Sequence, residues 1–303
     1  MINKLIKILF FICMAVSILA CSSAPEKSKP YWLQVANGFA DKGIVFYQQQ
    51  KYAASTVEFN RALNAYQRFD YVEGLAESYL NLAKSEIAQS NISNAKDYLR
   101  QLKALVEENN FTSMAVHLDI MQSSIAINMG ESGRVIEILD KYLGSVGENK
   151  MNVAENIYMA LLTNRVKVSI LSASDSEKWV NIYEAKVVKN DFYRARLLRF
   201  KGQLAGKLNK VNVVNKKFSQ ALNLYREQAN PKSVLSTLKE WGAALNDNKK
   251  FEGAIKRFEA AYKVAESSTN EFETRNVLNS LLKVYKNIGD EKNIQRINHL
   301  ISE

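Results

Sequence analysis

The sequence predicts an all-α protein built from a repeated pair of helices. Small residues recur about every 40 positions, no window shows the sustained apolar–polar alternation of a half-buried strand, and none of the three prolines falls inside a predicted helix. The recurring residues are Gly43, Ala83, Ser123, Thr163, Gly202 and Gly242, with Leu282 at the seventh position. A period of this length fits two helices with their connections, so each copy is expected to form one helix pair.

The first 20 residues are expected to be a secretion signal rather than part of the fold. Lys4 and Lys7 precede an uncharged apolar run at residues 8–20. The run Ile18-Leu19-Ala20-Cys21 resembles the lipobox of bacterial lipoproteins, in which a peptidase cuts just before the cysteine. That resemblance implies that Cys21 becomes the lipid-modified N-terminus. An ordinary signal peptide and an uncleaved anchor helix are the alternatives.

Residues 21–30 are then an acylated cysteine and a polar tether. The only other cysteine is Cys13, inside the predicted signal, so the mature chain is expected to contain no disulfide and no cysteine metal site. Two or more acyl chains anchor a protein stably to a membrane. Ser22 replaces the Asp that retains many such lipoproteins at the inner membrane, and the resemblance therefore implies the outer membrane, facing the periplasm.

Residues 31–303 are predicted to form the repeat domain. Twelve positions after each small residue lies a packing position of the second helix, and a large residue follows four positions later. These large residues are Phe59, Leu99, Leu139, Trp179, Phe218 and Phe258, with Asn298 as the exception. The fourth copy is the weakest, with Thr163 and Asp175 at its two small positions. The repeats lie near residues 36–70, 76–108, 114–147, 153–190, 193–228, 232–267 and 272–303.

This small–small–aromatic–small spacing resembles the tetratricopeptide repeat (TPR). The resemblance implies a right-handed superhelical α-solenoid of about seven TPR-like helix pairs. Each pair buries its apolar face on the next one, so the aromatic stripe is expected to be core rather than a binding site. Repeats of the family usually have 34 residues, and here about six more lengthen the helices or the connections.

No catalytic or metal-binding pattern stands out. His117 and His299 lie in different repeats, and the chain contains no zinc-ligand spacing, glycine-rich phosphate loop or nucleophile elbow. We therefore expect a protein that is not an enzyme. We also expect no metal and no cofactor beyond a covalent lipid on Cys21.

Positive charge is concentrated in the C-terminal part. Residues 22–192 hold 18 basic and 20 acidic side chains, whereas residues 193–303 hold 21 and 11. Residues 192–226 contain no carboxylate side chain. The TPR resemblance places certain first-helix residues on the inner, concave face. The groove that it implies contains Arg196, Arg199, Gln203, Lys207, Lys239, Asn246, Asn279, Lys283 and Lys286.

These features predict a lipid-anchored scaffold or adaptor of the bacterial cell envelope. Its expected partner is an envelope protein or peptide with acidic or carboxylate character. The scaffold would assist the assembly or regulation of an outer-membrane or cell-wall complex. The alternative is a lipoprotein whose basic repeats bind a polyanion such as a cell-wall polymer, lipopolysaccharide or DNA. Export argues against nucleic acid. A basic surface that serves only solubility stays open as well.

Overall fold

The computed structural model describes residues 29–144, 147–173, 175–187, 190–268 and 271–302, and all regular structure in these ranges is helical. The predicted signal, Cys21 and most of the tether lie outside them. The all-α prediction is confirmed for the described chain. Its fourteen helices are α2 (Tyr31–Gln48), α3 (Tyr52–Gln67), α4 (Val72–Ala88), α5 (Ile92–Asn109), α6 (Thr112–Asn128), α7 (Ser132–Leu143), α8 (Glu155–Ser172), α9 (Ser176–Lys186), α10 (Asp191–Lys207), α11 (Val211–Glu227), α12 (Pro231–Asp247), α13 (Phe251–Ser267), α14 (Glu271–Ile288) and α15 (Glu291–Ser302).

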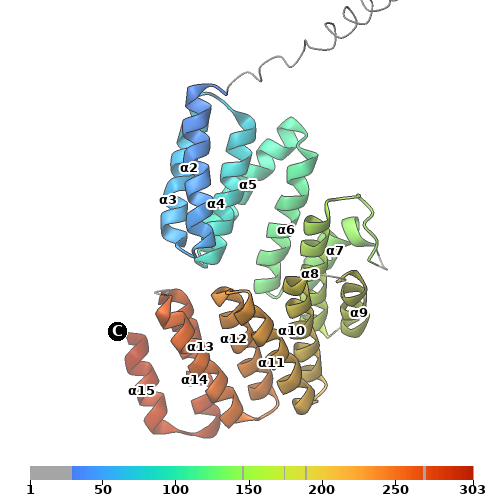
Figure 1. The fold of residues 1–303 in the computed structure, drawn as a ribbon, viewed down its shortest axis with the longest axis vertical. Helices are drawn as coiled ribbons and strands as arrows, with labels where there is room; N and C mark the ends of the chain where they lie inside the picture. Colours follow the sequence, from blue (N-terminus) through green and yellow to red (C-terminus); the bar gives the residue numbers. More distant parts are fainter. Residues whose placement is uncertain (1–28, 145–146, 174, 188–189, 269–270, 303) are drawn as a thin grey trace, which may run out of the picture.

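Neighbouring helices pack in sequence order. Each helix contacts the next one, and from α4 to α14 the even-numbered helices also contact one another in series. This arrangement is typical of an α-solenoid. The row of helices curves back, so that the ends of α2–α4 lie next to α12–α14 (Figure 1).

Within three pairs, the large residue of the second helix packs directly on the small residue of the first. A Cβ atom added at Gly43 would lie 2.5 Å from the Phe59 ring, one at Gly202 would lie 2.7 Å from Phe218, and one at Gly242 would lie 2.9 Å from Phe258. Glycine therefore allows each ring to lie directly against the backbone of the preceding helix. All three rings are buried, as are Leu99, Leu139 and Trp179. The aromatic stripe is core, as expected.

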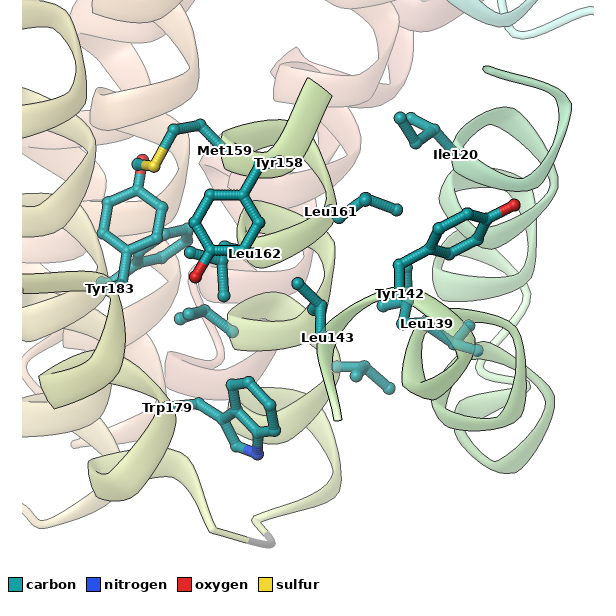
Figure 2. Packing of buried hydrophobic residues seen from close by; sticks show 14 of the residues in the cluster. Ile120, Leu139, Tyr142, Leu143, Tyr158, Met159, Leu161, Leu162, Trp179 and Tyr183 are labelled. Carbon is teal, nitrogen blue, oxygen red and sulfur yellow. The ribbon is translucent and has the colours of Figure 1, made fainter. Parts of the chain in front are cut away.

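The fourth pair departs from the pattern where the sequence was weakest. Asp175 is exposed and precedes α9 instead of occupying a packing position in it, because an unpaired carboxylate is costly to bury. The buried Thr163 donates a hydrogen bond to the Met159 carbonyl at 2.7 Å. Trp179 is buried as expected, with the Arg165 guanidinium 4.3 Å from its ring. Figure 2 shows side chains of α7, α8 and α9 filling this region.

Several turns between the two helices of a pair share one backbone conformation. Gln50, Ser90 and Lys249 adopt positive φ angles just before the second helices α3, α5 and α13. Gly130 and Gly289 do the same before α7 and α15, where glycine takes this conformation without steric cost.

Candidate functional site: the inner cavity

The main candidate site is a cavity of about 760 Å³ on the inner side of the curve. We call it the inner cavity. Only even-numbered helices and the residues just after them line it, namely α6, α8, α10 and α12. The lining residues are Ile127, Asn128, Lys167, Ile170, Leu171, Gln203, Gly206, Lys207, Asn209, Glu240, Ala243, Ala244, Asp247 and Asn248. The cavity thus combines apolar surface, amides and charges, and it lies on the face where the sequence predicted a groove.

Two of the nine predicted groove residues line this cavity. Gln203 is half-buried and Lys207 is exposed, and both belong to α10. Asn279, Lys283 and Lys286 are exposed residues of α14, outside the lining of the inner cavity. The structure therefore does not gather all nine residues into one site.

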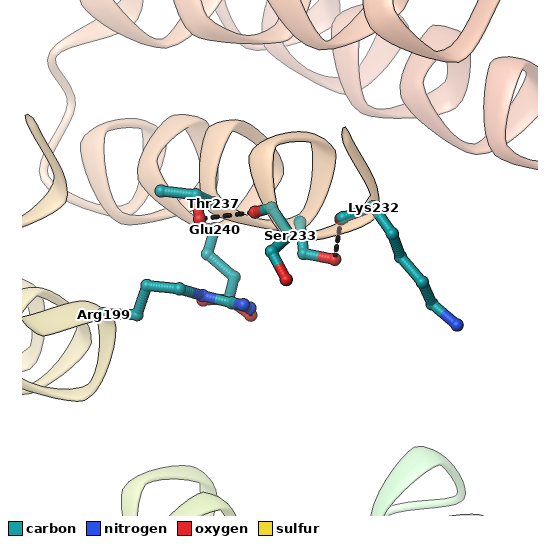
Figure 3. A network of polar contacts seen from close by, with 6 residues as sticks. Arg199, Lys232, Ser233, Thr237 and Glu240 are labelled. Carbon is teal, nitrogen blue, oxygen red and sulfur yellow. Dashed lines mark hydrogen bonds and ion pairs between the residues drawn. The ribbon is translucent and has the colours of Figure 1, made fainter. Parts of the chain in front are cut away.

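Arg199 is held by a carboxylate on the next inner helix. Its Nε donates to Oε2 of Glu240 at 2.9 Å, and its Nη2 donates to Oε1 of the same residue. The two side chains are 13% and 28% exposed, so this bidentate pair is largely shielded from water. Burial opposes the charge on Arg199, but Glu240 raises its pKa above the ordinary value. Figure 3 shows the guanidinium and the carboxylate side by side between α10 and α12.

Arg196 and Lys239 also have intramolecular partners. Arg196 donates to the Thr163 hydroxyl at 3.1 Å, and its guanidinium carbon lies 4.6 Å from the centre of the Phe192 ring. Lys239 forms an ion pair with Glu273 at 2.5 Å. Arg196, Arg199 and Lys239 therefore each link two neighbouring inner helices.

Asn246 takes part in a further link between inner helices. Its side-chain oxygen accepts a hydrogen bond from the Asn287 amide at 3.3 Å. This residue therefore joins α12 to α14 rather than lining the inner cavity.

Lys167 is the cationic residue of the cavity that sequence reasoning missed. It belongs to α8 and is exposed in the cavity, whereas its chain neighbours Val166 and Val168 are buried. Loss of solvation, followed by the charge of Arg196, lowers the pKa of Lys167 to about 8. A signal was present: Lys167 follows Thr163 by four residues, as the lining residue Gly206 follows Gly202. The weak match of the fourth repeat hid it.

A second cavity, of about 440 Å³, lies where the two ends of the curve meet. The Lys232 amine on α12 lies 5.6 Å from the Tyr47 ring centre and 5.1 Å from that of Tyr52. Burial, with a contribution from Glu273, raises the pKa of Tyr52 to about 12. Asn128 lines both cavities, which are therefore neighbours on the inner side of the curve.

Within the described ranges, no group of three or more histidine, cysteine, aspartate or glutamate side chains is arranged to hold a metal ion. His117 is half-buried, and burial together with the nearby Lys84 lowers its pKa. Of the helices described, none has both the length and the apolar character needed to cross a bilayer. No protein-family model matches this chain, and no curated protein shows significant sequence similarity to it.

Proposed function

We propose that this chain is a non-catalytic adaptor, anchored by a lipid on Cys21 and exposed to the periplasm at the bacterial outer membrane. Its inner face binds an extended segment of another envelope protein. Through that contact it assists the assembly or regulation of an outer-membrane or cell-wall complex. The observation that carries this proposal is the inner cavity, which four successive inner helices build together.

The fold supports a TPR-like superhelix of seven pairs. Inner helices begin at residues 31, 72, 112, 155, 191, 231 and 271, so most spacings are close to 40 residues. Phe59, Phe218 and Phe258 pack on glycines of the preceding helix, as the resemblance implies. Stacked pairs of this kind present a long concave surface, and extended peptides bind such surfaces with several side chains at once.

The charges on the inner face favour a peptide over a polyanion. A polyanion needs a continuous row of uncompensated cations. Glu240 and Glu273 instead neutralise Arg199 and Lys239, which lie in the middle of the predicted basic surface. Apolar lining such as Leu171 also suits side chains better than phosphates. Partner binding should therefore depend only modestly on salt, and a steep loss of binding with added salt would favour the polyanion.

Two experiments test the proposal. Cys21→Ala should release the protein from the membrane fraction of cells, because the acyl chains supply the attachment. Retention of this variant in the membrane would contradict the lipid anchor.

Partner capture tests the inner face. Leu171 is 57% exposed in the inner cavity, so Leu171→Glu should leave the fold intact and abolish co-purification of the partner. Val57 on α3 is 52% exposed and is the matched control, because it lines neither inner cavity. Equal capture by both variants would refute the assignment of the inner face.

A further inference from the structure

Lys167 is a cation without an intramolecular partner. Among the residues that the structure describes, none forms a hydrogen bond or ion pair with its amine. Arg199 and Lys239, on the neighbouring inner helices, each have a carboxylate partner. The amine is nonetheless held inside a cavity, where an unpaired charge is less favourable than on an open surface.

Most of the charged groups that act on Lys167 are also positive. Arg196 and Arg199 act on it from α10, and Lys232 acts from α12. The one carboxylate that acts on it is Glu240, whose two oxygens already accept hydrogen bonds from Arg199. Asp247 also lines the cavity, but it is not among the groups that act on the Lys167 amine, so in the described chain this accessible ammonium has no carboxylate of its own. A bound anion would supply the missing partner.

The remaining lining indicates what kind of anion fits. Ile127, Ile170 and Leu171 give the wall around Lys167 an apolar character. Asn128 and Gln203 add amides that can both donate to and accept from a peptide backbone. A phosphate is best bound by several guanidinium or backbone donors, whereas a single ammonium beside apolar surface suits one carboxylate on a short aliphatic stem.

We propose that Lys167 and the adjacent wall of the inner cavity bind an aspartate or glutamate side chain of an extended peptide, flanked by an apolar residue. This inference rests on the proposed function and names the class of segment that the adaptor takes. The Lys167 ammonium pairs with the carboxylate. Leu171 and Ile170 contact the neighbouring apolar side chain, and the amides contact the peptide backbone.

The state of Lys167 agrees with this role. Because its pKa is lowered to about 8, a fraction of the free protein lacks the charge at slightly alkaline pH. A bound carboxylate favours the ammonium form, so binding should take up a proton in that range. The charged groups that act on the amine are Arg196 and Arg199 from α10 and Lys232 and Glu240 from α12. Lys207 of α10 and Asp247 of α12 line the same cavity.

The test compares two libraries of octapeptides with blocked termini that differ only at one central position, glutamate in one and glutamine in the other. Fluorescence anisotropy measures binding to the intact protein. The glutamate library should bind at least about tenfold tighter, equivalent to about 1.4 kcal/mol. Lys167→Met should remove this preference. The matched variant Lys210→Met, exposed and outside the inner cavity, should keep it.

Lys167→Arg separates charge from structure. Binding of the glutamate library to the wild type should weaken from about pH 7 to about pH 9, as Lys167 loses its proton. The arginine variant should bind at both pH values without this loss, because its guanidinium stays charged. Excess inorganic phosphate should not displace the peptides.

Each contrary result has a distinct meaning. Equal binding of both libraries, or an unchanged preference in Lys167→Met, overturns the carboxylate subsite while peptide binding by the adaptor stands. Displacement by phosphate overturns the peptide assignment in favour of a general anion site. Absence of binding by either library, together with unchanged partner capture by Leu171→Glu, overturns both the subsite and the proposed function.

Discussion

The close approach of Phe59 to Gly43 offers a sharp test of how the helix pairs are held together. An added Cβ at Gly43 would lie 2.5 Å from two carbons of the Phe59 ring, whereas ordinary contacts begin at 3.4 Å. The ring is 2% exposed, and Ser55 donates a hydrogen bond to the Gly43 carbonyl at 2.9 Å. Neither the ring nor the backbone has free space into which to move.

The expected cost of Gly43→Ala follows from two opposing effects. Overpacking of this kind costs about 1–3 kcal/mol, and replacing glycine by alanine within a helix returns about 1 kcal/mol. Gly38 lies in the same helix, and no atom lies within 4 Å of its added Cβ. Gly38→Ala should therefore stabilise the protein by about 1 kcal/mol. Because both changes gain the same helix propensity, their difference of about 1–3 kcal/mol measures the clash alone.

Hydrogen exchange of α2 and α3 in the purified full-length protein is the appropriate assay, because repeat proteins can open locally. Gly43→Ala should exchange faster than Gly38→Ala in both helices. Adding Phe59→Leu to Gly43→Ala should reduce the cost of the alanine. Equal protection of the two alanine variants would refute the close packing of Phe59 on α2.

Three further outcomes follow from the charges inside the curve. Glu240→Gln should lower the pKa of Lys167 further, because the Glu240 carboxylate raises it. Carbon-13 NMR of methylated lysines measures this pKa. An unchanged value would show that the two groups are not close. The unfolded chain holds more protons at Lys167 than the folded chain between its lowered pKa of about 8 and the ordinary 10.5, so stability should rise with pH in that window. Lys167→Met should lack this rise when melting temperatures at about pH 7 and about pH 9 are compared, and an identical rise would assign the effect to other groups. Lys232→Ala should broaden the distance distribution between spin labels on α3 and α14, because it removes cation–π contacts worth about 0.5–1 kcal/mol each. Lys210→Ala is the control for that experiment, and equal broadening in both would contradict the contact between the ends.

The sequence was most informative where packing is local. Small residues such as Gly202 and large residues such as Phe218 recur 16 positions apart, so their spacing predicted a repeated helix pair, and the structure shows that the two residues meet within it. The fold class and most of the buried stripe followed from this. At Asp175 the same spacing failed, because the cost of burying a carboxylate outweighs the repeat pattern.

The candidate site was harder to predict because it depends on contacts between pairs. The resemblance placed Arg199 on the inner face, but it did not reveal that its side chain pairs with Glu240 of the next inner helix. Curvature, which brings Lys232 to Tyr47 and Tyr52, is the sum of many small rotations between pairs and has no local signature. The sequence also does not show that the Lys167 amine lacks a partner, because this depends on which side chains of the neighbouring inner helices reach it.

Site-specific photo-crosslinking in living cells tests most directly whether the inner face binds a partner. A photoreactive residue in place of Leu171 in the inner cavity should crosslink to one envelope protein, through a segment that contains aspartate or glutamate. The same residue in place of Val57 on α3 should give no such product, and Lys167→Glu should abolish the product at position 171. A crosslink from position 57 alone, or one at 171 that Lys167→Glu leaves unchanged, would contradict the account.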